Sequence, residues 1–324
     1  MTAADAATPL AHALARGTVL LDGGLSNQLE AQGNDLSDEL WSARLLAEAP
    51  GEIEAAHAAY VRAGARVLIT SSYQASFEGF GRRGLSEEES AALFRRSVEL
   101  ARTASGDTAG GPVWVAASVG PYGAVLADGS EYRGRYGLSM AQLVAFHRPR
   151  IEALVAAAPD VLALETVPDA LEAEAMLRAA DGCGVPVWLS YTVAEGAAAR
   201  RATMRGGGRV TGGLTRAGQP LAESFAVAAG NPQVLAVGVN CCAADKVGEA
   251  LEAAAQACPG VPLVAYPNSG EGWDAGRAAW TGAASFDAAL AAEWVALGAR
   301  LVGGCCRVGP DAITALGEVL RQAD

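Results

Sequence analysis

The chain has 324 residues, of which 51% are hydrophobic and 19% charged, and its formal net charge is −12. The hydrophobic fraction is ample for a core, and the acidic excess argues against a nucleic-acid binder, which needs a basic face. It argues equally against an anionic membrane surface as the partner. The N-terminus lacks the pattern of a signal peptide, and no segment approaches the ~20 apolar residues of a membrane span. We therefore expect a cytoplasmic protein with reduced cysteines.

Short, nearly continuous apolar runs recur along the chain and predict eight parallel strands that are buried on both faces. They cover residues 18–24, 66–72, 113–120, 161–167, 186–192, 234–241, 262–268 and 300–306. Helical patterns lie between most of them. One helix is predicted to begin at Ser86, with Glu89 completing a capping box. Another begins at Ser139 and contains Pro149, which predicts a kink or a break.

Eight strand–helix units in a chain of this length predict a single-domain α/β protein, a (β/α)₈ TIM-type barrel over residues 1–324. The first residues, about 1–16, are expected to form an N-terminal extension. A doubly wound sheet is the alternative that the alternation leaves open. Two long loops, 120–137 and 194–220, follow strands, where lids and substrate walls are commonly found. The glycines of 206–213 neither follow a strand nor open a helix, which favours a flexible loop over a phosphate site.

The active sites of such barrels lie at the carboxyl ends of the strands, and these ends are polar in this sequence. Most of the predicted strands end in acidic, hydroxyl, amide or thiol side chains. The strand ends are Asp22-Gly23-Gly24, Thr70-Ser71-Ser72-Tyr73, Glu165-Thr166, Asn240-Cys241-Cys242, Tyr266-Pro267-Asn268 and Gly304-Cys305-Cys306. For Asp22 and Glu165, two acids at one mouth favour ligand binding over helix capping.

Cysteines end the sixth and eighth strands, whose equal parity could bring Cys241 close to Cys305 and Cys306. Neighbouring side chains on a regular strand point in opposite directions, so the adjacent pair converges only where the backbone bends. Gly303 and Gly304 permit such a bend. Three converging thiolates form a zinc site with an open fourth position, the pattern of catalytic zinc. The residues alone leave two alternatives open, inert packed thiols and a redox-active vicinal disulfide.

The remaining candidate residues have simpler interpretations. Three histidines lie in helical patterns away from the strand ends: His12, His57 and His147. We interpret them as surface residues or as hydrogen-bonded helix residues. Cys183 and Cys258 lie in loop or helix-end positions and are interpreted as structural.

Seven motifs, in this order, resemble those of the homocysteine S-methyltransferases, especially the short bacterial and plant enzymes that use S-methylmethionine or S-adenosylmethionine. They are LLDGGLSNQLE, ITSSYQASFEGF, GPYGAVLADGSEYRG, ETVPDALEAEA, GVNC, YPNSGE and GGCCR, and the resemblance runs from about residue 18 to about residue 317. It implies a (β/α)₈ barrel with a Zn²⁺ ion held by Cys241, Cys305 and Cys306. Because Cys242 follows Cys241 in this chain, a change of ligand to Cys242 is an alternative.

The resemblance also implies substrate-binding residues. Glu165 matches the acid that holds the amino group of homocysteine. The positions expected around the amino-acid backbone of the substrate are Asp22, Gly23, Gly24, Ser71 and Ser72. Asn240 adjoins a metal ligand and could orient it. Trp41 and Tyr73 match aromatic residues near the methyl donor, where they could hold its positive charge by cation–π attraction.

The expected chemistry needs a strong nucleophile and no general acid, because the leaving group of a sulfonium is a neutral thioether. Zinc deprotonates the thiol that it binds, so no catalytic residue beyond the zinc-activated substrate thiol is expected. The expected partners are small molecules: homocysteine with S-methylmethionine or S-adenosylmethionine. Alternatives keep the fold and the zinc with selenocysteine as acceptor or betaine as donor, or make the protein a non-enzymatic zinc or thiol sensor. The sequence does not predict the oligomeric state.

Overall fold

A computed structural model describes residues 9–36, 42–106, 111–194, 212–274 and 279–323. Eight parallel strands form one sheet in the order β1-β10-β7-β6-β5-β4-β3-β2. Their bounds are β1 Val19–Leu20, β2 Val67–Ile69, β3 Trp114–Val119, β4 Val161–Val167, β5 Val187–Tyr191, β6 Val234–Asn240, β7 Leu263–Tyr266 and β10 Ala299–Val302. A parallel bridge between Leu21 and Val67 joins the two outermost strands. The predicted barrel is confirmed, and the doubly wound alternative is wrong because its sheet would have two open edges.

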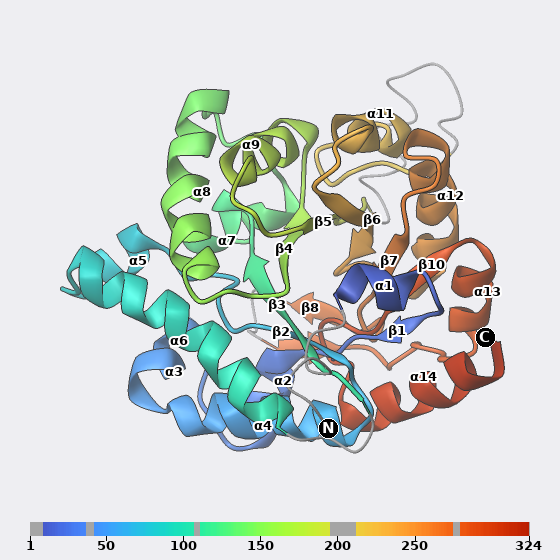
Figure 1. The fold of residues 1–324 in the computed structure, drawn as a ribbon, viewed down its shortest axis with the longest axis horizontal. Coiled ribbons are helices and arrows are strands. Elements are labelled where there is room, and N and C mark those ends of the chain that lie inside the picture. The colour runs from blue at the N-terminus through green and yellow to red at the C-terminus, as the bar shows by residue number, and fades with distance from the viewer. Residues whose placement is uncertain (1–8, 37–41, 107–110, 195–211, 275–278, 324) are drawn as a thin grey trace.

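Helices surround the strands, as Figure 1 shows. Their bounds are α1 Leu10–Leu14, α2 Leu25–Ala31, α3 Ser42–Glu48, α4 Pro50–Arg62, α5 Phe77–Arg82, α6 Glu87–Ser105, α7 Tyr122–Leu126, α8 Met140–Val155, α9 Ala170–Ala180, α11 Leu221–Phe225, α12 Val247–Ala257, α13 Leu290–Ala296 and α14 Pro310–Ala323, with 3₁₀ turns η2 Ser130–Tyr132, η3 Ala226–Ala228 and η4 Ala244–Lys246. The predicted capping box of Ser86 and Glu89 begins α6. Of the kink or break predicted at Pro149, the break does not occur, because α8 continues through it with a buried face packed against α6 and α9.

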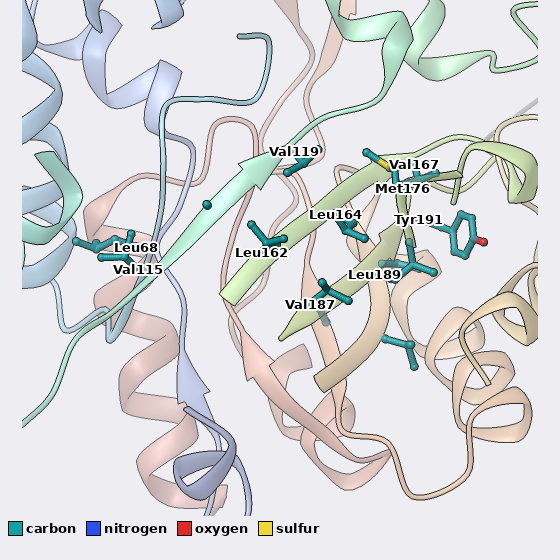
Figure 2. Close-up of a cluster of buried hydrophobic side chains, with 14 of the residues drawn as sticks. Leu68, Val115, Val119, Leu162, Leu164, Val167, Met176, Val187, Leu189 and Tyr191 are labelled. Carbon is teal, nitrogen blue, oxygen red and sulfur yellow. The ribbon is translucent and has the colours of Figure 1, made fainter. Parts of the chain in front are cut away.

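Alternating strand residues fill two separate apolar layers. Leu162 and Leu164 of β4 point outward into a large cluster shared with the helices, part of which Figure 2 shows. Val161 and Ala163 belong to a second, smaller cluster that also contains Trp188. This is the alternation expected of a barrel whose interior is a packed core. The residues that face inward at the carboxyl ends of the strands therefore surround the mouth of the barrel.

Several short elements were not predicted. Within the segment expected as an extension, α1 buries Leu10 and Leu14 against the inner cluster, so these residues pack with the barrel. After β7, β8 (Gly272–Asp274) and β9 (Ala279–Thr281) form an antiparallel hairpin. The loop predicted over 120–137 contains α7 and η2. Within the described residues, no helix is both long enough and apolar enough to cross a membrane.

The interpretation of the histidines as surface residues or hydrogen-bonded helix residues holds for His12 and His147 and is wrong for His57. His147 Nε2 lies 3.1 Å from Glu172 Oε1, which makes His147 a hydrogen-bonded helix residue. His57 is fully buried on α4, and burial lowers its pKa to about 4. Neither of its ring nitrogens has a hydrogen-bond partner among the described residues. His12 is exposed on α1.

Candidate metal and substrate site

Three cysteine thiols converge at the mouth of the barrel. Cys241 directly follows β6, while Cys305 and Cys306 lie three and four residues after the end of β10. The Cys241 and Cys306 sulfurs are 3.7 Å apart, and those of Cys305 and Cys306 are 4.0 Å apart. All three sulfurs lie within 4.8 Å of one another. The juxtaposition predicted from strand parity is therefore present.

The loop after β7 holds both cysteine segments in place. The backbone N–H of Cys305 donates to the Pro267 carbonyl over 2.8 Å, and that of Cys306 donates to Asn268 Oδ1 over 3.1 Å. Cys241 has a φ of 49°, a left-handed backbone conformation that L-residues rarely adopt. Since neither cysteine segment continues as a regular strand, the side chains escape the alternation that would separate them.

Glycines let the chain pass close to the cysteine turn. A Cβ on Gly24 would lie 2.6 Å from the Cys305 carbonyl oxygen, and one on Gly23 would lie 2.1 Å from that of Val308. A Cβ on Gly304 would overlap the Val308 side chain, and one on Gly303 would overlap Leu21 and the Asp22 carbonyl oxygen, directly after β1. Neither Gly303 nor Gly304 has a positive φ, so these glycines serve close approach more than bending. Gly23 and Gly24 thus dock the end of β1 onto the turn.

The contacts among the three thiols shift their pKa values in opposite directions. Hydrogen bonds from Cys305 and Cys306 hold the pKa of Cys241 well below its usual range, with smaller contributions from Tyr132 and Arg216. The pKa values of Cys305 and Cys306 are correspondingly raised, chiefly by their contacts with Cys241. A thiolate is the metal-binding form of cysteine, so the cluster is prepared to bind a thiophilic cation.

The arrangement fits a zinc ion. Sulfurs bound tetrahedrally at ~2.3 Å from zinc lie roughly 3.8 Å apart, close to the two separations found here. All six cysteines are free, which leaves the three sulfurs available as ligands. Three soft thiolates suit zinc and do not suit the hard cations magnesium and calcium. Three ligands without a fourth protein ligand are typical of catalytic zinc.

The other cysteines lie elsewhere. Cys242 is fully buried in the outer apolar cluster and does not belong to the three-thiol group, which disfavours the change of ligand. Cys258 is buried, with its sulfur 3.4 Å from the Phe225 carbonyl oxygen, and burial raises its pKa. Cys183 contacts the Val185 carbonyl.

A polar layer lies above the apolar interior of the barrel. Inward-facing residues at the strand ends form it: Ser118, Glu165, Ser190, Asn240 and Tyr266. Ser118 Oγ donates a short hydrogen bond to Glu165. Burial raises the pKa of Glu165 to about 7, against the lowering effect of hydrogen bonds from Ser118 and Tyr266. A buried carboxyl group with this pKa changes charge near neutrality and is suited to binding an ammonium group.

Asp22 and Ser71, both predicted to bind substrate, have unused hydrogen-bonding capacity. Asp22 is fully buried, and its Oδ2 accepts from the N–H of Ile69 over 2.9 Å. Its Oδ1 has no partner among the described residues, and neither does the buried Ser71 hydroxyl. Burial raises the pKa of Asp22, and the nearby Glu165 raises it further. Leaving a buried polar atom without a hydrogen bond costs roughly 1–3 kcal/mol, so a ligand that supplies the missing hydrogen bond binds more tightly.

Asn240 and Ser72 form hydrogen bonds to neighbouring strands beside the site. Asn240 Oδ1 accepts from the N–H of Thr166 and its Nδ2 donates to Thr166 Oγ1, both over 2.7 Å. These bonds secure Thr166, whose φ is 57°, directly after Glu165. Ser72 Oγ donates to the Ser118 carbonyl over 2.7 Å. Asn240 therefore positions the end of β4, a function that its place beside Cys241 did not predict.

The predicted aromatic residues are only partly described. Trp41 lies outside the described residues. Tyr73 follows β2, and hydrogen bonding to Thr166 places its side chain at the mouth of the barrel. The backbone carbonyls of Tyr73 and Gly120 each accept from the buried Arg150 guanidinium over 3.1 Å. Arg150 thereby joins the loops after β2 and β3.

Sequence reasoning missed three residues beside the thiols. Tyr132 Oη lies 3.3 Å from Cys241 Sγ, and the Arg216 guanidinium lies 5.2 Å from the centre of the Tyr132 ring. Glu131 precedes Tyr132 and is buried. The long loops containing them were expected to form substrate walls, but no periodic pattern distinguishes the individual residues.

Comparison with known proteins places the chain near enzymes of one kind. The family model described as homocysteine S-methyltransferase matches residues 19–320. The homocysteine S-methyltransferase of Escherichia coli strain K12 is 44% identical, over 92% of this chain and 94% of its own length. Homocysteine S-methyltransferase 4 of Zea mays is 42% identical, over 96% of this chain and 91% of its own. The crystal structure of the E. coli homocysteine methyltransferase MmuM in its metallated form matches with a TM-score of 0.81 at 42% identity, over 96% of this chain and 99% of that one.

Proposed function

The chain belongs to the homocysteine S-methyltransferase family, and from this premise we propose that it transfers a methyl group to homocysteine from a sulfonium donor, with zinc. The donor is S-methylmethionine or S-adenosylmethionine, and the product is methionine. The S–CH₃ bond of the sulfonium breaks, and its electron pair stays on the departing sulfur, which becomes a neutral thioether. A new S–CH₃ bond forms on the sulfur of homocysteine, whose thiol proton goes to water. Membership of a methyltransferase family leaves the sensor alternative without support.

The observation that carries the zinc proposal is the convergence of three thiols at the mouth of the barrel. Cys241, Cys305 and Cys306 are the proposed ligands. When bound there, zinc supplies the Lewis acidity that keeps a thiol deprotonated at neutral pH. The proposed reaction needs reduced ligands, so we place it in the cytoplasm, where thiols are kept reduced.

The buried polar atoms of the mouth are proposed to hold the amino-acid part of homocysteine. Glu165 accepts from the ammonium group, while Asp22 Oδ1 and the Ser71 hydroxyl supply further hydrogen bonds. The Asp22 Oδ1 atom and the Ser71 hydroxyl are buried without hydrogen-bond partners among the described residues, which supports this assignment. Polar groups of a ligand would supply the missing hydrogen bonds and so offset the cost of burying these atoms. Fixing homocysteine in this way aligns its sulfur with the donor methyl group, and positioning of this kind supplies much of the rate in such reactions.

No side chain needs to donate a proton to the leaving thioether. The described polar layer agrees with this, since the two fully buried histidines lie on α4 and α8 and outside that layer. Tyr73, and Trp41 by its resemblance, are proposed to face the cationic donor, where a cation–π contact contributes about 0.5–2 kcal/mol.

The test is an assay of zinc-loaded protein with homocysteine and each sulfonium donor in turn. Loss of the homocysteine thiol and formation of methionine are followed together. We expect both with at least one donor, and the ratio of kcat/KM values identifies the preferred one. Absence of methionine with both donors would overturn the proposal.

A further inference from the structure

A buried carboxylate beside the thiols has no part in the function proposed so far. Glu131 lies in η2, within the segment that joins β3 to α8, and is only 9% exposed. Its Oε2 has no hydrogen-bond partner among the described residues. Asp128 in the same segment is exposed and accepts a hydrogen bond from the backbone N–H of Ser130, so it has the local capping function that Glu131 lacks.

Glu131 is placed at the reacting end of the site. The next residue, Tyr132, has its hydroxyl 3.3 Å from Cys241 Sγ, which anchors η2 to the thiol cluster. Burial raises the pKa of Tyr73, and the charge of the Glu131 carboxylate raises it further. Glu131 thus directly precedes the tyrosine that contacts a proposed metal ligand, and its charge acts on the aromatic residue assigned to the donor.

An isolated anion in this place is costly. The negative charges of Cys241 and Asp128 repel it, and burial removes it from water, so its pKa is raised to about 7. A buried anion of this kind is stabilised when a cation occupies the adjacent space.

We propose that Glu131 recognises the positive charge of the sulfonium donor and so selects it against the neutral thioethers of the same shape. This inference rests on the proposed function, because it names the group that accepts the donor of that reaction. The thioethers methionine and S-adenosylhomocysteine retain the amino and carboxyl groups of their sulfonium counterparts. A residue that discriminates between the two classes must therefore respond to the charge, or the methyl group, on sulfur.

The positive charge on the donor sulfur disappears during the reaction. This predicts how KM and kcat respond when Glu131 is replaced. Glu131 interacts more strongly with the charged donor than with the transition state, in which the charge is partly neutralised. Such an interaction lowers the KM for the donor without raising kcat. Removing it therefore raises the KM for the donor, while kcat does not fall and the KM for homocysteine stays nearly constant.

The experiment compares wild type, Glu131→Gln and Asp128→Asn in calorimetric titrations at pH 8. Each variant is titrated with S-methylmethionine against methionine, and with S-adenosylmethionine against S-adenosylhomocysteine. In wild type we expect tighter binding of the sulfonium for the donor that supports turnover. In Glu131→Gln this preference should fall by about tenfold or more, the scale of a lost buried charge pair, with bound zinc unchanged. Asp128→Asn removes a carboxylate from the same segment and should keep the preference.

Three other outcomes would contradict either the inference about Glu131 or the proposed function. If Glu131→Gln keeps the sulfonium preference while wild type turns over, the inference is wrong and the proposed function stands. If Glu131→Gln weakens the sulfonium and the thioether equally, Glu131 acts on another part of the ligand, and the inference is again wrong. If wild type forms no methionine, the proposed function itself fails.

Discussion

Cys241 and Cys242 are neighbours in the chain, yet only the first belongs to the thiol cluster. Cys241 is the residue with the left-handed backbone, and its sulfur faces Cys306, while Cys242 is buried among apolar side chains between the barrel and its helices. The two positions form a matched pair for testing the metal site, because the same substitution can be made one residue apart.

We predict that Cys241→Ser lowers the zinc retained after dialysis by at least half, whereas Cys242→Ser retains the wild-type amount. The reason is that only Cys241 lies within reach of the other two sulfurs. Metal content measured by mass spectrometry decides the matter. Zinc loss confined to Cys242→Ser would show that the ligand assignment is reversed.

The pKa of Glu165 gives a prediction about pH. Burial raises this pKa to about 7, so the carboxylate that would accept an ammonium group is lost as pH falls below 7. The KM for homocysteine should therefore rise between pH 8 and pH 6, approaching about tenfold per unit at the acid end. In Glu165→Gln the KM for homocysteine should be high at every pH, and this part of its pH dependence should be absent.

The comparison of wild type with Glu165→Gln also controls for the metal site. Because the thiol ligands are unchanged in this variant, effects of pH on zinc binding cancel in the comparison. Identical profiles would refute the assignment.

The sequence predicted the chemistry of individual residues best where they end strands. Asp22, Glu165 and Cys241 were identified because a parallel barrel brings the carboxyl ends of its strands to one mouth. Glu131 and Tyr132 were not identified, because they lie in a 3₁₀ turn within a long connection, and no periodicity marks which of its side chains turn inward. The burial of His57 was also missed, since a helical pattern does not reveal an isolated polar residue on the packed face.

At the scale of elements, the turn that carries Cys305 and Cys306 depends on close packing against the end of β1. The Gly24 N–H donates to the Val308 carbonyl over 3.0 Å, and Tyr60 Oη donates to the Gly24 carbonyl over the same distance. The carbonyl of Cys305 occupies the space in which a Gly24 side chain would lie.

Gly24→Ala should therefore displace the turn and weaken zinc binding by about tenfold, the usual scale for changes that disturb metal ligands indirectly. Gly309→Ala is the control, because its added Cβ would have no atom within 4 Å and its φ is not positive. Competition with a zinc-binding dye measures both affinities. Equal affinities in the two variants would show that the packing does not set the geometry of the turn.

Strands and most helices were predictable because their signals are local. Each strand that is buried on both faces is an apolar run, and α6 begins with a capping box. The β8–β9 hairpin was not predicted, because each of its strands has only three residues. The break expected at Pro149 failed because the packing of α8 against its neighbours outweighs one lost backbone hydrogen bond.

For the whole molecule, the thiol cluster joins distant parts of the chain. Cys241 lies 65 residues before Cys306, at the ends of strands that are separated by β7 in the sheet. An unfolded chain does not hold such a site together, so zinc binds mainly to the folded protein. Binding of this kind stabilises the fold by mass action, by about 2.7 kcal/mol at a free zinc concentration 100 times the Kd.

Removing zinc with a chelator should therefore lower the Tm of wild type by several degrees, at about 2–4 °C per kcal/mol for a large single domain. The Tm of Cys305→Ala should hardly respond, because this variant lacks one ligand. Differential scanning calorimetry with and without chelator provides both values. A similar decrease in both proteins would indicate a zinc site elsewhere.

The most direct test of the account follows the methyl group itself. Zinc-loaded wild type and Cys306→Ser are incubated with homocysteine that carries a carbon-13 label in its backbone and with donor whose sulfonium methyl groups are deuterated, and methionine is analysed by mass spectrometry. We predict deuterated methyl on the sulfur of homocysteine-derived methionine with wild type and a loss of at least about 100-fold in Cys306→Ser. Unlabelled product, no product with either donor, or equal rates in the two proteins would contradict methyl transfer at the three-thiol site.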